Sequence, residues 1–232
     1  MGNTYLYNKE KWDAENPIKG YSQEGHISLF ITGKRVEGNW AHVDEQSNIY
    51  ELKAVVENIL CRVGMPQNNV VLKHSDNNIF SKGVQYETRA GKVLVEMGIL
   101  SLKLKKAFDI EQDVFYADVH WDNLMKAIKK VSLTYTDISK YPSVSRDLAL
   151  LVDKSVEFEQ IEMIARQTEK KLLKSVLLFD VYEGKNLPEG KKSYAVNFIL
   201  QDEEKTLNDK QIDAIMKKLI ANLTGKLNAE LR

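Results

Sequence analysis

Hydrophobic and polar positions divide the second half of the chain into segments of alternating period. An aliphatic run at 146–152 follows Tyr141-Pro142 and predicts a buried strand. Apolar residues then recur every three or four positions, which predicts an amphipathic helix. The residues of its inner face are Phe158, Ile161, Ile164, Ala165, Thr168 and Leu172. Branched and aromatic residues at 176–182 and alternation at 193–200 predict two further strands.

A second helix and a short last strand complete this half of the chain. Asn208 and Gln211 have the spacing of a capping box, and Gly225 is expected to end the helix. Its buried stripe is Ile212, Ile215, Leu219 and Leu223. Residues 228–232 are long enough for one more strand. The order strand, helix, strand, strand, helix, strand predicts a ferredoxin-like βαββαβ sandwich over 141–232, with one open sheet face.

The first half of the chain, 1–130, has the pattern of a mixed α+β domain with a largely antiparallel sheet. Strands are predicted at 27–32, 70–73, 92–100 and 114–120. Helical periodicity predicts a long helix from Ser47 and a short one at 121–129. The long helix is expected to bury Ile49, Leu52, Val55, Val56, Ile59, Leu60 and Val63. Residues 131–140 contain no glycine and are expected to form an ordered connector.

The open sheet face of the second half carries the candidate binding residues. Asp180 and Tyr182 point to the same side of a strand, because side chains alternate. A ring beside a carboxylate can stack an unpaired base and accept hydrogen bonds from its edge. Ser193 begins the neighbouring strand, and Arg232 returns beside it if the last strand joins the sheet. The competing interpretation is structural: Tyr182 half-buried and Asp180 capping the hairpin.

Charge and cysteine content narrow the class of protein. The formal net charge is zero, which argues against binding nucleic acid by broad electrostatics alone. The single cysteine, Cys61, excludes an intrachain disulfide, is expected to pack inside the long helix, and favours a cytoplasmic setting. No apolar run has membrane-spanning length, and no signal peptide opens the chain, so no membrane association is predicted.

The first half shows no recognisable catalytic or metal-binding motif. Its histidines lack metal-ligand spacing, and each is expected to be a surface or hydrogen-bonded residue. They are His26, His42, His74 and His120. Its three arginines, Arg35, Arg62 and Arg89, have no phosphate-binding context. The sequence therefore predicts no catalytic residue and no metal ligand.

Four short signatures stand in a fixed order near the end of the chain. They are KYPSVSRDLALLV at 140–152, FDVYEG at 179–184, GKKSYAVNFIL at 190–200 and TLND at 206–209. With the terminal Leu231-Arg232, this series resembles the ferredoxin-fold anticodon-binding domain that closes the beta subunit of bacterial phenylalanine–tRNA ligases. The resemblance implies that the anticodon-reading positions are Asp180, Tyr182, Ser193 and Arg232.

The first half is similar, more loosely, to the catalytic-like domain of the same subunits. The matching pieces are Gly33 to Trp40, IYELK at 49–53 with Glu57, 93–100 and 114–119. The chain departs from the family where it has Tyr86 to Gly91 and Met97 to Ser101 in place of a Pro-Gly pair and a Gly-Glu-Leu-His-Pro run. The resemblance implies a class II synthetase-like antiparallel sheet domain that does no catalysis. This agrees with the three arginines of the first half, none of which has a phosphate-binding context.

The resemblance also implies a biological setting. The chain is expected to be a C-terminal fragment, inactive alone, of an α2β2 enzyme that joins phenylalanine to tRNA(Phe). ATP and Mg²⁺ are expected to bind outside this region, and the partners are tRNA(Phe) and the alpha subunit. The alternative is a stand-alone ferredoxin-like regulatory or scaffolding protein that binds a small effector. That alternative predicts a glycine-rich turn after the first strand, where the chain has Val152-Asp153-Lys154-Ser155.

Overall fold

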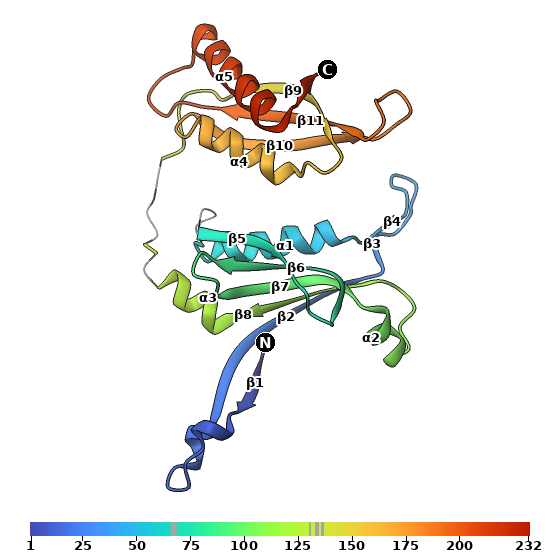
Figure 1. Cartoon of the computed structure of the whole chain (residues 1–232), viewed down its shortest axis with the longest axis vertical. Coiled ribbons are helices and arrows are strands. Elements are labelled where there is room, and N and C mark those ends of the chain that lie inside the picture. Colours follow the sequence, from blue (N-terminus) through green and yellow to red (C-terminus); the bar gives the residue numbers. More distant parts are fainter. Residues whose placement is uncertain (66–68, 130, 133–134, 136) are drawn as a thin grey trace. The chain divides into compact units, whose positions relative to one another are not determined.

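The computed structural model describes residues 1–65, 69–129, 131–132, 135 and 137–232. The chain forms two compact units, Met1–Thr134 and Tyr135–Arg232 (Figure 1). Each unit combines helices with an antiparallel sheet, which confirms the α+β fold class. In the expected connector 131–140, Tyr135 and Ile138 are exposed, and part of that segment lies outside the described residues.

The first unit is built on a six-stranded antiparallel sheet in the order β1-β2-β8-β7-β6-β5. Its strands are β1 (Gly2–Tyr7), β2 (Tyr21–Thr32), β5 (Val70–His74), β6 (Phe80–Thr88), β7 (Val93–Leu100) and β8 (Val114–His120). A two-stranded sheet pairs β3 (Lys34–Val36) with β4 (Glu45–Gln46). Strand β1 and the start of β2 form an arm that extends from the sheet, with the short 3₁₀ turns η1 (Lys9–Lys11) and η2 (Pro17–Gly20) at its tip (Figure 1).

Helices cover one face of this sheet. They are α1 (Ile49–Arg62) and α3 (Trp121–Ile128), while the short α2 (Leu102–Ala107) follows β7. Helix α1 begins at Asn48, whose side chain accepts hydrogen bonds from the amides of Tyr50 and Glu51. The buried core between the helices and the sheet contains Leu52, Val56, Leu60, Val95, Met97, Ala117, Val119 and Leu124.

Two expectations about α1 are wrong. Val55 is 38% exposed and Cys61 is exposed, although both were assigned to the inner face. The stripe that is buried follows i, i+4, i+8 from Leu52. A single sheet face therefore covers a narrower strip of α1 than its apolar pattern suggests.

The second unit has a four-stranded antiparallel sheet in the order β10-β11-β9-β12. The strands are β9 (Val144–Asp153), β10 (Leu173–Tyr182), β11 (Lys191–Leu200) and β12 (Glu230–Leu231). Helices α4 (Phe158–Thr168) and α5 (Asp209–Leu227) lie together against one face (Figure 1). The core between them includes Leu150, Val152, Ile161, Val196, Phe198, Leu219 and Leu223. This confirms the ferredoxin-like βαββαβ sandwich.

Helix ends in the second unit follow capping chemistry. The capping box at α5 is present: the amide of Gln211 donates to Asn208 Oδ1 at 2.9 Å, and the amide of Asn208 donates to Gln211 Oε1 at 3.2 Å. The predicted end at Gly225 is wrong, because α5 continues to Leu227 and stops at Asn228, which has φ of 50°. Asparagine tolerates this left-handed conformation and so can close the helix.

Candidate nucleic-acid interface

The side of the second sheet that faces away from α4 and α5 brings together residues from all four strands. Registers place Tyr182 opposite Ser193, Ser193 opposite Leu151, and Leu151 opposite Glu230. A parallel row runs from Asp180 through two alanines to the C-terminal residue: Asp180, Ala195, Ala149 and Arg232. Paired residues share a face of an antiparallel sheet, so both rows point the same way.

The rows point to the open face because their neighbours fill the core. Tyr194 and Phe198 of β11 and Leu150 of β9 are buried against the helices. Ser193, Ala195 and Asn197 alternate with these core residues and therefore lie on the other side. We call the surface formed by Asp180, Tyr182, Ser193 and Arg232, with Ala149, Ala195 and Leu151 beneath it, the open face.

Tyr182 and Arg232 meet across this open face. The guanidinium carbon of Arg232 lies 5.4 Å from the centre of the Tyr182 ring, within the range of a cation–π contact. The amide of Arg232 donates to the carbonyl oxygen of Ala149 at 3.1 Å, so the backbone of the terminal residue is held on the sheet. Ser193 and Leu151, which lie in the register row between these strands, are 5% and 9% exposed. Ring and guanidinium thus form one continuous surface.

Gly184 leaves room for the Tyr182 ring. A Cβ atom at position 184 would lie 2.3 Å from the Tyr182 hydroxyl oxygen and 2.4 Å from the ring carbon that bears it. Such distances are far below van der Waals contact, so any side chain at 184 forces the ring to move. The glycine of the FDVYEG signature therefore sets the position of the tyrosine two residues before it.

The two neighbouring lysines at the start of β11 have different roles. Lys191 forms an ion pair with Glu230 of β12, and this hydrogen bond raises the pKa of Lys191. Lys192 points to the helix side, is 9% exposed, and lies 4.7 Å from the centre of the Tyr194 ring. Neither ammonium group is therefore available on the open face to bind a phosphate. The ion pair between Lys191 and Glu230 instead attaches β12 to the rest of the sheet.

Sequence reasoning placed the four site residues on one face, and the structure brings them together there. Asp180 is exposed next to a bulge between Leu178 and Asp180, and it shares its side with Tyr182. Tyr182 is exposed, with a relative accessibility of 36%, so part of its ring is accessible on this face. Ser193 differs from the expectation of an offered hydroxyl, because its side chain is buried within the row. Gly184 and the Lys191–Glu230 pair were not identified from the sequence.

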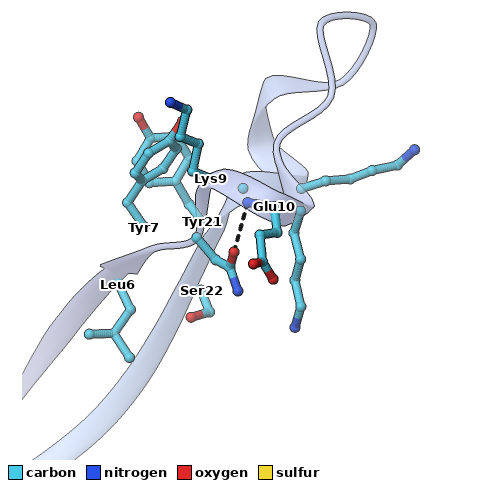
Figure 2. A pocket seen from close by; sticks show the side chains of 10 residues that line it. Leu6, Tyr7, Lys9, Glu10, Tyr21 and Ser22 are labelled. Carbon is cyan, nitrogen blue, oxygen red and sulfur yellow. Dashed lines mark hydrogen bonds between the residues drawn. The ribbon is translucent and has the colours of Figure 1, made fainter.

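The first unit has a separate hollow on its arm. Figure 2 shows Tyr7, Lys9, Tyr21 and Ser22 around it, with the amide of Glu10 donating to Asn8 Oδ1 at 2.9 Å. The Tyr7 and Tyr21 ring centres are 5.0 Å apart. None of the predicted site residues lines this hollow, and its lining side chains are exposed.

In the part of the chain that the structure describes, none of the helices combines the length and apolar character needed to cross a membrane.

Two family models match the chain. Residues 1–121 match the phenylalanyl tRNA synthetase beta chain CLM domain, and residues 139–232 match the ferredoxin-fold anticodon binding domain. The second match contains the whole open face described above. The first covers the six-stranded sheet and α1.

Similar proteins carry one name throughout. The phenylalanine–tRNA ligase beta subunit of Bacteroides thetaiotaomicron is 54% identical over 232 residues, which is 100% of this chain and 28% of that protein. The corresponding subunit of Porphyromonas gingivalis is 48% identical over 231 residues, again 100% of this chain and 28% of the relative. The subunit of Clostridium acetobutylicum is 32% identical over 94% of this chain and 29% of its own length. The chain thus spans little more than a quarter of these relatives, and it belongs to the beta-subunit family of phenylalanine–tRNA ligases.

Proposed function

We propose that the open face of the second unit binds the anticodon stem-loop of tRNA(Phe). The observation that carries this proposal is the joint surface of the Tyr182 ring and the Arg232 guanidinium, with the Asp180 carboxylate beside it. Sequence-specific RNA recognition targets unpaired loop bases, which stack on aromatic rings or guanidinium planes and hydrogen-bond through their edges. The anticodon is such a set of unpaired bases.

Each side chain has a distinct task in this proposal. The Tyr182 ring offers a stacking surface, and one base–aromatic stack contributes about 1–3 kcal/mol. The carboxylate oxygens of Asp180 accept hydrogen bonds from the amino or imino edge of a base. Arg232 extends the stacking surface or bonds a phosphate oxygen. Ser193 is buried beneath them and contributes by shaping the floor of the site.

We infer further that the chain acts as part of a cytoplasmic α2β2 phenylalanine–tRNA ligase. In this setting the alpha subunit provides a docking partner, and ATP and Mg²⁺ serve the reaction outside this region. The family membership and the span of little more than a quarter of its relatives support this inference. The alternative, a stand-alone effector-binding protein, is not favoured because the matches to this family cover both units.

The residues of the first unit do not fit an ATP site. Its arginines lie on β3, at the end of α1 and in the β6–β7 turn, and Arg35 is bound to Glu45 and Glu51. Where Gly83 and Gly98 could leave space on the sheet, Phe80 fills it: a Cβ on either glycine would lie 2.7–2.8 Å from the ring. On the sheet side opposite α1, the Phe80 ring therefore occupies the space beside these two glycines, and Arg35 is held in ion pairs rather than free for a triphosphate.

The experiment is a binding titration with the complete chain. A fluorescently labelled tRNA(Phe) anticodon stem-loop is titrated at low ionic strength, since salt weakens phosphate contacts. We expect saturable binding that is reduced by Tyr182→Ala and kept by Tyr141→Ala. Tyr141 is a matched control, because it lies in the same unit and is also 36% exposed. Equal binding by both variants, or equal binding of a stem-loop with a changed anticodon, would contradict the proposal.

A further inference from the structure

Two histidines that are far apart in the sequence lie side by side in the first unit. His26 of β2 pairs directly with His120 of β8, and their ring centres are 4.8 Å apart. Glu24 precedes His26 by two residues on β2 and so projects from the same side of the strand. This is the sheet side opposite α1 and α3, because the alternate residues Ile27 and Val119 pack in the core.

A carboxylate fixes the tautomer of His26. Its Nδ1 lies 2.9 Å from one carboxylate oxygen of Asp118 and 3.0 Å from the other. A carboxylate oxygen accepts this hydrogen bond, so Nδ1 carries a proton, and in the neutral imidazole Nε2 then carries the lone pair that a metal needs. That Nε2 is 3.1 Å from Thr4 Oγ1 and 4.0 Å from Glu24 Oε2. A histidine oriented in this way by a carboxylate is the usual form of a metal-ligating histidine.

His120 has an unused nitrogen. Its Nε2 is buried and has no hydrogen-bond partner, while its nearest carboxylate oxygens belong to Glu96 at 3.7 Å and Asp118 at 4.0 Å. A buried polar atom without a partner is unfavourable, and such an atom in a native structure calls for an explanation. Together with His26 and Glu24, His120 offers a ligand atom, and the three atoms all lie within 4.8 Å of one another.

We propose that Glu24, His26 and His120 form a zinc site, with Asp118 supporting His26 from behind. Zinc bonds of about 2.0–2.2 Å in a tetrahedron place ligand atoms about 3.3–3.6 Å apart. The three ligand atoms here lie within 4.8 Å of one another, so the cluster has to close by about 1.5 Å at most. Glu24 is 49% exposed and free to make this movement. Water completes the coordination. The proposal differs from the sequence-based expectation that the histidines of this unit hold no metal.

The donor set restricts the class of metal. Two imidazoles with one carboxylate suit zinc and other first-row transition ions, whereas Mg²⁺ and Ca²⁺ prefer oxygen ligands. Glu24, Glu96 and Asp118 also place three carboxylates around two imidazoles, and a divalent cation offsets this local negative charge. The bound ion joins β2 to β8 at the point where the arm leaves the sheet, because Glu24 pairs with Thr4 of β1 and His26 pairs with His120. Its role is to fasten the arm.

The test uses the complete chain, freed of metal by a chelator and titrated with ZnCl₂ in a calorimeter. We expect one zinc per chain, a higher melting temperature with zinc than with MgCl₂, and slower proteolysis in the arm. Glu24→Gln and His120→Gln lower the zinc affinity at least tenfold, and Asp118→Asn lowers it about 10–100-fold. Glu24 is exposed, so its variant keeps the fold and isolates the ligand effect.

Matched controls exclude other zinc-binding groups. His42→Gln and Glu37→Gln change exposed residues of the same types in the same unit, and Cys61→Ser removes the exposed thiol. All three are expected to bind zinc as the parent chain does. Absence of stoichiometric binding, unchanged affinity in Glu24→Gln and His120→Gln, or loss of binding in Cys61→Ser or His42→Gln would overturn the proposal.

Discussion

The guanidinium of Arg232 and the ring of Tyr182 are in contact, although β12 and β10 are the two edges of the sheet. Three strand spacings of about 4.8 Å separate such edges by about 14 Å. Contact is possible because the central positions in the row of Arg232 are Ala149 and Ala195, whose short side chains leave space above the sheet. A long cation from one edge can therefore lie over the middle of the sheet and reach a ring from the other.

Replacing Tyr182 by alanine is expected to weaken binding of the anticodon stem-loop by about 1–3 kcal/mol, the value of one base–aromatic stack. Phenylalanine at this position should retain most of the affinity, because the ring face is kept. Fluorescence anisotropy with the labelled stem-loop measures both. Thermal unfolding of the same variants is the control: a sharp fall in melting temperature with unchanged affinity per folded molecule would make Tyr182 a packing residue.

Gly184→Ala should weaken RNA binding without touching the RNA. The new Cβ atom would overlap the Tyr182 hydroxyl group, so the ring must swing from its place beside Arg232. Affinity is expected to fall toward that of Tyr182→Ala, with little change in melting temperature, because the ring moves at an exposed edge.

A double-mutant cycle checks this mechanism. If alanine at 184 acts only through the ring, the double variant Tyr182→Ala/Gly184→Ala binds RNA like Tyr182→Ala alone. Additive losses would show that Gly184 acts on RNA by a separate route.

The sequence predicted those parts of the fold in which local chemistry and burial agree. The capping box of Asn208 and Gln211 and the alternation of β11 are confirmed. Strand β1 was missed because all its residues are exposed, so no apolar alternation marks it. Strand β6 was missed because Lys82-Gly83 interrupts its pattern, and Gly83 is required there by the overlying Phe80 ring. Tertiary packing selected that glycine, which local patterns cannot show.

The candidate sites divide in the same way. Asp180 and Tyr182 are two residues apart on one strand, so alternation alone places them together. The contact of Arg232 with Tyr182 depends on strand order across the whole sheet. The pairing of His26 with His120 depends on the register of β2 and β8, and no local spacing signals it.

Glu230→Gln should loosen the last strand in a pH-dependent way. The hydrogen bond to Glu230 raises the pKa of Lys191 in the folded chain. The stability that this ion pair contributes is therefore complete below the ordinary lysine pKa of about 10.4. It is lost as the pH rises through the raised pKa of Lys191 in the folded chain. We expect the parent chain to melt slightly higher than Glu230→Gln at neutral pH, and this difference to vanish at strongly alkaline pH.

The matched control for this experiment is Glu203→Gln. Glu203 pairs with Lys174 away from the open face, and that pair lowers the pKa of Glu203. Its loss should leave RNA affinity unchanged, whereas Glu230→Gln should reduce it through Arg232. Identical RNA affinities for the two variants would show that the ion pair between Lys191 and Glu230 does not support RNA binding.

The complete chain should form no phenylalanyl-adenylate from ATP and phenylalanine. The first unit presents the Phe80 ring over Gly83 and Gly98 and binds Arg35 into ion pairs. Radiolabelled pyrophosphate exchange is the measurement, with the chain supplied at high concentration. Phenylalanine-dependent exchange above the background of a heat-denatured sample would contradict this prediction.

Ala195→Leu tests whether the empty centre of the open face is needed. Ala195 is partly exposed in the row between Asp180 and Ala149, and a leucine there would stand in the space that the Arg232 side chain crosses. The strand and the core beneath are unaffected, because the neighbouring core residues Tyr194 and Val196 point to the helices. We therefore expect a melting temperature close to that of the parent and a loss of stem-loop affinity comparable with that of Arg232→Ala.

The double variant Ala195→Leu/Arg232→Ala should lose no more affinity than either single variant, since both changes separate the guanidinium from the Tyr182 ring. Ile199→Leu, farther along the same side of β11, is the matched control and should bind RNA normally. Full affinity in Ala195→Leu would mean that the contact between Arg232 and Tyr182 has no part in recognition.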